Sequence, residues 1–211
     1  KAFIKAVEGA EDSKTLAVED LKNINISAND VVVGIAASGR TPYVLGGIEY
    51  AKSIGAKTAS ISTSANTVLS SLVDCPIEAV TGAEPITGST RMKSGTAQKM
   101  ICNIISTAAM VKMGKVYQNL MIDVQATNEK LVARSISILK EITGLDDEIA
   151  KAVYEKYGSV KKAMLGVLAD ISLEEVERLL NKNKEPKVRG VAVSCEGGDN
   201  TKVQQQIYAT V

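Results

Sequence analysis

The chain has 211 residues, of which 45% are hydrophobic and 23% charged, as in an ordinary globular protein. Its 25 Lys and Arg residues are balanced by 24 Asp and Glu residues, so the net charge is +1. This balance provides no basic field for nucleic acid or an anionic membrane, and no apolar run has membrane-spanning length. We expect neither a nucleic acid nor a membrane partner, so an anionic ligand needs a local site.

The residue types that are absent restrict the chemistry. The chain has no His, the commonest general base and metal ligand, and no Trp to stack on nucleic acid bases. Cys75, Cys102 and Cys195 have neither metal-ligand spacing nor the pattern of a disulfide framework. We expect no metal, no disulfide and a cytoplasmic location. An enzyme built from this chain would use carboxylates, lysines, hydroxyls or backbone dipoles.

The first half of the chain alternates helical and strand patterns. Helical spacing begins after a plausible N-cap at Ser13, and β-branched runs read as strands buried on both faces of a parallel sheet. A strand, loop, helix and strand in this order form a βαβ unit, which predicts an α/β fold with right-handed crossovers. The expected elements are helices over 14–24 and 43–53, and strands over 30–36, 57–63 and about 76–80.

The second half is predicted to be helical. Residues 94–113 are apolar and small, which indicates a largely buried helix, and another helix is expected over 126–143. Three short amphipathic helices follow, with N-caps at Asp146, Ser159 and Ser172. An appendage of this size is only marginally stable alone, so we expect it to pack on its neighbour or on a partner subunit. A turn, a possible strand and a polar tail are expected after Lys184.

The loop between the strand over 30–36 and the next helix is a candidate phosphate site. It contains Ser38, Gly39, Arg40 and Thr41, with Pro42 in the first helical turn. The amides of a helix N-terminus attract anions, and ligands of open parallel sheets lie beyond the carboxyl ends of the strands. In the alternative interpretation, the hydroxyls only cap the helix.

A dense acidic turn precedes this loop in the chain. Glu8, Glu11 and Asp12 lie within five residues, so mutual repulsion would raise the pKa of a buried member. A carboxylate with such a pKa suits proton abstraction beside a carbonyl. The alternative is a solvated acidic end of a helix. A third segment, residues 82–99, alternates hydroxyls with Gly, Arg and Lys, and would either bind an anionic sugar or cap a helix.

These segments together resemble the N-acetylmuramic acid 6-phosphate etherase family. The resemblance is carried by AVEGAEDS at 6–13, VVVGIAASGRTPYV at 31–44, residues 82–99 and NLMIDVQATNEKL at 119–131. It covers about residues 1–183 and implies a three-layer, parallel-sheet sugar-isomerase (SIS) domain with a small C-terminal three-helix appendage. The implied domains are a partial SIS domain over 1–143, the appendage over 144–183 and a tail of unclear origin over 184–211.

The resemblance implies a cofactor-free lyase of cell-wall amino sugar recycling. Such enzymes cleave the D-lactyl ether of N-acetylmuramic acid 6-phosphate to N-acetylglucosamine 6-phosphate and D-lactate, by elimination and then hydration. Glu11 matches a catalytic glutamate that removes the C2 proton, and Glu8 is the second candidate for that role. Substrate binding falls to the loop Ser38 to Thr41 and to Lys93. The family forms homodimers.

The resemblance also implies upstream parts that these 211 residues lack. The family has a further phosphate loop and a second catalytic glutamate ahead of the acidic motif, whereas this chain starts at Lys1, inside a helix-like stretch. We therefore expect a segment of a longer protein that is inactive or severely impaired by itself. Two other functions stay open: a non-enzymatic phosphosugar sensor like the glucokinase regulatory protein, and a phosphosugar aldose-ketose isomerase.

Overall fold

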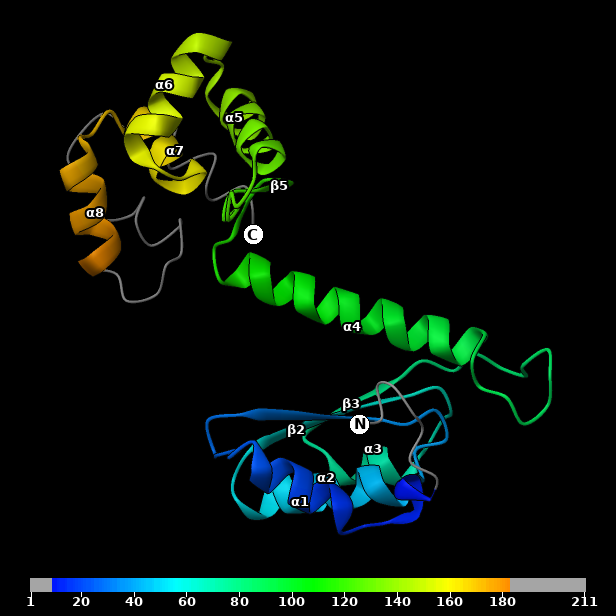
Figure 1. Ribbon diagram of the computed structural model, residues 1–211. Coiled ribbons are helices and arrows are strands. Elements are labelled where there is room, and N and C mark those ends of the chain that lie inside the picture. The colour runs from blue at the N-terminus through cyan, green and yellow to red at the C-terminus, as the bar shows by residue number, and fades with distance from the viewer. Residues whose placement is uncertain (1–8, 183–211) are drawn as a thin grey trace. The chain divides into compact units, whose positions relative to one another are not determined.

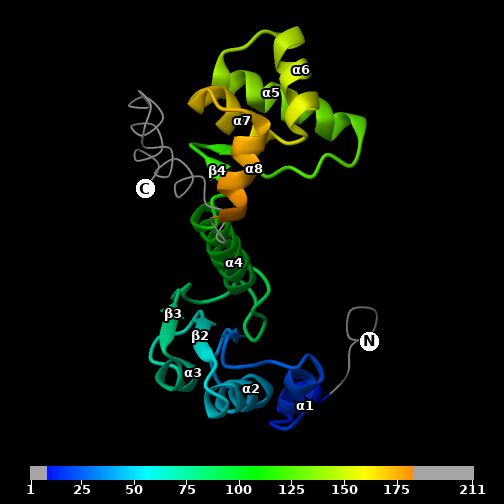
Figure 2. The same cartoon turned by 90° about the vertical axis from the view of Figure 1, so that its left-hand side faces the viewer.

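The computed structural model describes residues 9–182 of the chain, and Figures 1 and 2 show it from two sides. These residues belong to two compact units, and the division between the units falls between Ile105 and Ser106.

The first unit is a parallel α/β layer pair. Its strands pair in the order β1-β2-β3, with Val33 opposite Ala59 and Ala59 opposite Cys75. Helices α1, α2 and α3 lie on the same side of this sheet (Figures 1 and 2). The α/β class and the parallel sheet are thereby confirmed. The elements are a 3-10 turn η1 (Ala10–Asp12), α1 (Leu16–Asn23), β1 (Val31–Ile35), α2 (Pro42–Ser53), β2 (Lys57–Ser62), α3 (Val68–Leu72) and β3 (Cys75–Glu78).

Close packing fixes the acidic turn and α1 against α2. Gly46 of α2 lies so near the carbonyl oxygen of Lys14 that a Cβ at this position would be 2.1 Å from it. Only glycine fits such a contact. Helix α1 begins at Leu16 with Thr15 as N-cap, two residues later than predicted, although the Ser13 hydroxyl still accepts the Leu16 amide at 3.3 Å.

One face of β1 is uncovered. Val31 is 65% exposed, Val33 36% and Ile35 42%, whereas Gly34 and Ala36 of the same segment are buried. The core of this unit, built around Ala36, Ile48 and Leu69, therefore lies on the side of the helices. The prediction of a strand buried on both faces is wrong for β1.

Helix α4 (Lys93–Lys112) is likewise not a core helix. Ser94 is its only buried residue, and six large apolar side chains on the helix or just after it are exposed. The composition predicted a helix at the right place. The predicted burial is wrong, because α4 is largely exposed within the described residues. The exposed side chains are Met100, Ile104, Ile105, Met110, Val111 and Met113.

The second unit is mainly helical. A short antiparallel hairpin, β4 (Val116–Tyr117) and β5 (Leu120–Met121), turns at Gln118 with φ +53°. This hairpin was not predicted, because strands of two residues each leave no periodic pattern in the sequence. The helices are α5 (Glu129–Thr143), α6 (Asp147–Tyr157), α7 (Val160–Ala169) and α8 (Leu173–Lys182), so the three predicted short helices are confirmed.

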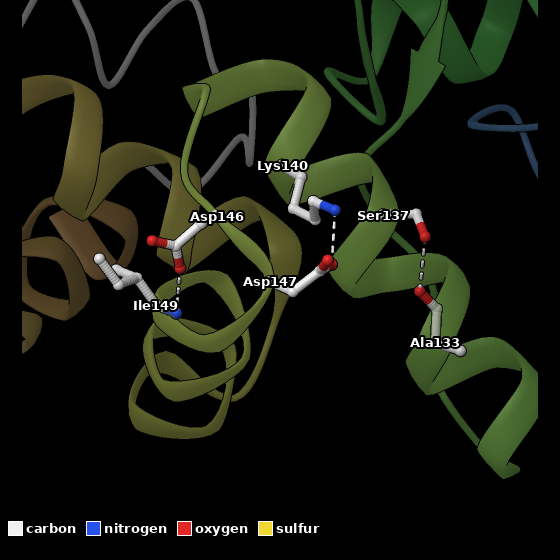
Figure 3. Close-up of polar contacts among 6 residues, drawn as sticks. All are labelled: Ala133, Ser137, Lys140, Asp146, Asp147 and Ile149. Carbon is white, nitrogen blue, oxygen red and sulfur yellow. Dashed lines mark hydrogen bonds and ion pairs between the residues drawn. The ribbon is translucent and has the colours of Figure 1, made fainter.

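Side-chain caps define where these helices begin. Asp146 accepts the Ile149 amide at 2.9 Å, Ser159 accepts the Lys162 amide at 3.3 Å and Ser172 accepts the Glu175 amide at 3.2 Å. The three predicted N-caps are thus confirmed. Figure 3 shows the junction of α5 and α6, where the Lys140 amine lies 2.5 Å from the Asp147 carboxylate beside the Asp146 cap.

The core of the second unit includes residues from α5 to α8 and from the hairpin. Leu139, Met164 and Val176 are fully buried there, and the Tyr157 hydroxyl donates to the Ile171 carbonyl at 2.9 Å. Because α5 packs against α6 and α7, it shares a compact unit with the appendage. The predicted domain boundary at residue 143 stays a prediction, and the tail over 184–211 lies outside the described residues. None of the helices described is both long and apolar enough to cross a membrane.

Candidate functional site

The candidate site lies where the parallel strands end. The segment 36–41 follows β1 and leads into α2, and residues 63–67 follow β2. Since the carboxyl ends of parallel strands meet at one edge of a sheet, the two loops become neighbours. The Leu69 amide donates to the Gly39 carbonyl at 3.0 Å, and the Thr63 amide to the Ala37 carbonyl at 3.0 Å. The loop from Ser38 to Thr41 is therefore held by the segment after β2.

Gly39 makes the tight turn of this loop possible. Its φ of +62° is in the left-handed region, and a Cβ there would lie 2.3 Å from the Cβ of Thr67. A side chain at residue 39 would meet both backbone strain and a clash. Thr67, in turn, accepts the Ser70 amide at 3.1 Å as the N-cap of α3. A side chain at residue 39 would therefore displace Thr67, the residue that caps α3.

The N-terminus of α2 carries no side-chain cap. Thr41 is its N-cap residue, but the Thr41 side chain accepts no amide of the helix, and no acidic residue lies in the first turn. The exposed Ser38 hydroxyl accepts the Arg40 amide at 3.4 Å, a long contact. Capping therefore does not account for the hydroxyls of this loop. The partial positive charge of the helix and the exposed Arg40 suit an anionic group.

Hydroxyl groups connect this loop to the beginning of α4. The Thr63 hydroxyl lies 2.9 Å from that of buried Ser94 and donates to the Ala37 carbonyl at 3.3 Å. The Thr81 hydroxyl lies 3.4 Å from the Ser94 hydroxyl. The first turn of α4, with Lys93, is thereby placed next to the segment that holds the Ser38 loop.

A carboxylate caps α4. The two oxygens of Glu84 accept the Lys93 amide at 3.0 Å and the Ser94 amide at 2.9 Å. These hydrogen bonds, that of Ser94 first, lower the pKa of Glu84 from its ordinary value of 4.5. Glu84 is thus ionised near neutral pH and shields the N-terminus of α4 from other anions. The Lys93 side chain is exposed at this end of the helix.

The acidic turn is only partly described. Glu11 lies in η1, which contacts α2, and its side chain is exposed. The predicted burial of a carboxylate in this turn is absent at Glu11. Glu8 lies outside the described residues. The roles predicted for these two glutamates remain proposals.

Thr63, Thr67 and Glu78 were not predicted as residues that connect the loops, and Ser94 was predicted only as part of the segment 82–99. Thr63, Thr67 and Ser94 hold the Ser38 loop and α4 in place, and Glu78 at the end of β3 accepts the Asn66 and Thr67 amides at 3.0 and 3.1 Å. The available signal was the hydroxyl-rich run 62–67 at the carboxyl end of a predicted strand, where sheet ligands and their supports gather.

Comparisons with known proteins give this site its family context. The chain is 56% identical over 183 residues to the N-acetylmuramic acid 6-phosphate etherase of Exiguobacterium sp., covering 86% of the chain and 62% of the relative. The family model of the glucokinase regulatory protein N-terminal SIS domain matches residues 1–52. The chain is a homologue of the N-acetylmuramic acid 6-phosphate etherases. The parallel sheet with its helical layer is that of a SIS domain, as predicted.

Etherases of Bacillus give similar alignments. The etherase of Bacillus cereus (strain AH820) is 56% identical and that of Bacillus cytotoxicus 54% identical, each over 188 residues, 89% of the chain and 63% of the relative. The chain therefore spans less than two thirds of the length of these etherases.

A second family model matches the C-terminal part of the chain. The model of the SpoIIIAG C-terminal domain matches residues 94–211, more than half of the chain, so over this stretch the chain belongs to that family as well. The match overlaps the stretch that resembles the etherases and also includes residues 184–211, for which the sequence showed no etherase resemblance. The predicted tail over 184–211 thus lies within this second match.

Proposed function

We propose that this chain is part of a carbon-oxygen lyase that cleaves the D-lactyl ether of N-acetylmuramic acid 6-phosphate. The supporting observation is the 56% identity to the Exiguobacterium etherase, combined with an uncapped helix N-terminus behind the Ser38 loop. The products are N-acetylglucosamine 6-phosphate and D-lactate. The proposed setting is cytoplasmic recycling of peptidoglycan amino sugars, without a cofactor.

The loop after β1 is the proposed binding site of the phosphosugar. Backbone amides of the first turn of α2, the Ser38 hydroxyl and the Arg40 guanidinium offer donors to an anion. Gly39 lets the backbone approach the ligand closely, while Thr41 provides a hydroxyl that is not engaged as a helix cap. Lys93 provides a further cation at the start of α4.

Glu11 is the proposed base. Its carboxylate takes the proton from C2 of the open-chain sugar, and the C2 electron pair forms the C2–C3 double bond as lactate leaves C3 with the electrons of the ether bond. Water then adds its hydroxyl at C3 of the unsaturated aldehyde while a proton returns to C2, which gives open-chain N-acetylglucosamine 6-phosphate. Glu8 is the second candidate for the base. Glu11 is exposed in the described residues, so the proposed role requires that substrate or further polypeptide cover it and exclude water.

The 211-residue chain by itself is proposed to be inactive or severely impaired. It spans only 62–63% of the length of the etherases, and the resemblance assigns a second catalytic glutamate and another phosphate loop to parts without counterpart here. Without an acid for the departing lactate, the elimination loses the group that protonates the leaving oxygen.

The decisive measurement is D-lactate release from N-acetylmuramic acid 6-phosphate. Three proteins are compared: the chain alone, a chimera that adds the unmatched portion of the Exiguobacterium etherase, and the same chimera with Glu11→Gln. Activity is expected in the chimera alone, with Glu11→Gln lowering kcat by at least about a hundredfold. Glu19→Gln on exposed α1 is the control and is expected to leave kcat unchanged.

A phosphosugar sensor is the second candidate function, because the glucokinase regulatory protein SIS model matches residues 1–52. A chimera that binds the phosphosugar but releases no lactate would favour this sensor and contradict the lyase.

We also infer a homodimer, in which α4 lies at the interface. Met100, Ile104 and Val111 recur at helical spacing, and each is more than a third exposed within the described residues. Apolar stripes of this kind mark protein interfaces. Ile104→Lys is expected to halve the mass measured by light scattering, whereas Ile149→Lys, at a similarly exposed position in α6, leaves it unchanged. A monomeric unsubstituted chain would contradict the dimer.

A further inference from the structure

The segment after β2 is held from both sides at the carboxyl edge of the sheet. β2 lies between β1 and β3, so residues 63–67 lie between the Ser38 loop and the end of β3. On the β1 side, the Leu69 amide donates to the Gly39 carbonyl at 3.0 Å. On the β3 side, the contact is made by Glu78, the last residue of that strand. A change at the end of β3 can therefore reach the Ser38 loop.

The Glu78 carboxylate binds two successive backbone amides. One oxygen accepts the Asn66 amide at 3.0 Å, and the other accepts the Thr67 amide at 3.1 Å. Asn66 has a φ of +51°, a left-handed conformation that costs free energy and persists only where the surroundings hold it. The Ser70 hydroxyl first, and these two amides after it, lower the pKa of Glu78 from 4.5. An ionised carboxylate thus fixes this turn at neutral pH.

Thr67 transmits this constraint to the Ser38 loop. A Cβ on Gly39 would lie 2.3 Å from the Cβ of Thr67 and 2.5 Å from its hydroxyl, so the two residues lie against each other. The Thr67 hydroxyl also lies 2.7 Å from that of Ser70 and accepts the Ser70 amide at 3.1 Å. Because Gly39 precedes the amides of the proposed anion site, a displaced Thr67 would change the positions of those amides.

We propose that Glu78 is a positioning residue for the anion site, a role that rests on the proposed function of the Ser38 loop. Its carboxylate holds the turn at residues 66–67, and this turn holds Gly39 and the start of α2 in the conformation that receives the sugar phosphate. Donors that are already in place bind an anion more tightly, because the ligand does not have to order them. The negative charge of Glu78, acting alone, would instead repel the anion. The sign of the effect separates positioning from charge.

The test measures binding of N-acetylglucosamine 6-phosphate to the complete 211-residue chain by nuclear magnetic resonance of the Gly39 and Arg40 amides. Glu78→Gln keeps one acceptor oxygen but replaces the other by an amino group, which cannot accept a backbone amide. The loop then has its binding conformation in a smaller fraction of molecules. We expect the dissociation constant to rise at least about fivefold, and hydrogen exchange of the Leu69 amide to become faster.

Asp74→Ala is the matched control. Asp74 lies just before β3, at the opposite end of the strand from Glu78, and its carboxylate accepts the Thr58 amide at 2.9 Å and the Thr58 hydroxyl at 3.0 Å. The alanine removes both bonds from the same unit, far along β3 from the Ser38 loop. We expect the affinity and the exchange of the Leu69 amide to stay unchanged. Urea midpoints of both variants show how far each is destabilised.

Three results would overturn the proposal. Tighter or unchanged binding in Glu78→Gln would show that the carboxylate does not position the donors of the anion. Equal weakening in Asp74→Ala would show that binding follows the stability of the whole unit. Absence of binding to the unsubstituted chain would remove the anion site itself. Lactate release is not measured, so failure of the lyase proposal with intact phosphosugar binding would leave this test unaffected.

Discussion

At the scale of single residues, Gly39 combines two constraints that are separable by substitution. Gly39→Ala places a side chain at φ +62° and 2.3 Å from Thr67, which we expect to destabilise the first unit by about 2–4 kcal/mol. Gly82 is the matched control, because its φ is +68° but no atom lies within 4 Å of its added Cβ. Gly82→Ala is expected to cost only about 1 kcal/mol, from backbone strain. Urea unfolding measures both, and equal effects would contradict the clash.

Glu84 gives a pH-dependent prediction. Its folded pKa is lowered from 4.5, so its ionised form stabilises the fold above that pH, and the contribution is lost as the pH falls through the lowered value. Glu84→Gln is therefore expected to lower the urea midpoint at pH 7, with the difference vanishing in acid. Glu49→Gln, exposed in α2, is the control and is expected to show no such pH dependence. A constant difference across pH would contradict the charged cap.

The local sequence pattern predicted the Ser38 loop, but not the hydrogen bonds that hold this loop in place. A strand, a glycine-containing loop and a helix are adjacent in sequence, so their joint placement follows from short-range rules. The Thr63–Ser94 hydrogen bond joins residues 31 positions apart, and no local periodicity encodes that contact. Likewise, a β-branched run shows that β1 is suited to burial. The run does not show which other elements are present to cover each face of the strand.

At the scale of elements, helix α7 contains Gly166, a residue with low helix propensity that close packing against α6 requires. A Cβ on Gly166 would lie 2.3 Å from the ring of Tyr157 in α6. Gly166→Ala is therefore expected to destabilise the second unit by about 1–3 kcal/mol. Gly95→Ala in α4 is the matched control: its Cβ would have its nearest atom at 3.7 Å, so it is expected to stabilise by up to about 1 kcal/mol. Thermal unfolding measures both, and stabilisation by both would contradict the contact.

At the scale of the whole molecule, the two compact units predict two separate cooperative transitions. Gly39→Ala is expected to raise the hydrogen exchange of β1 and β2 while leaving α6 and α7 unchanged, and Gly166→Ala to do the reverse. The double variant is expected to show additive effects on stability, because the sites share no packing partner. Exchange that rises across the whole chain in either single variant would show one cooperative unit.

The exposed side of α4 has a chemical consequence beyond its shape. Met100 and Met110 lie on this helix and Met113 follows it, each at least 41% exposed. A thioether open to peroxide becomes a sulfoxide, which is polar and chiral, so an oxidant converts this apolar stripe into a hydrophilic one. The proposed self-association through α4 would then depend on redox conditions and return when a methionine sulfoxide reductase restores the thioethers.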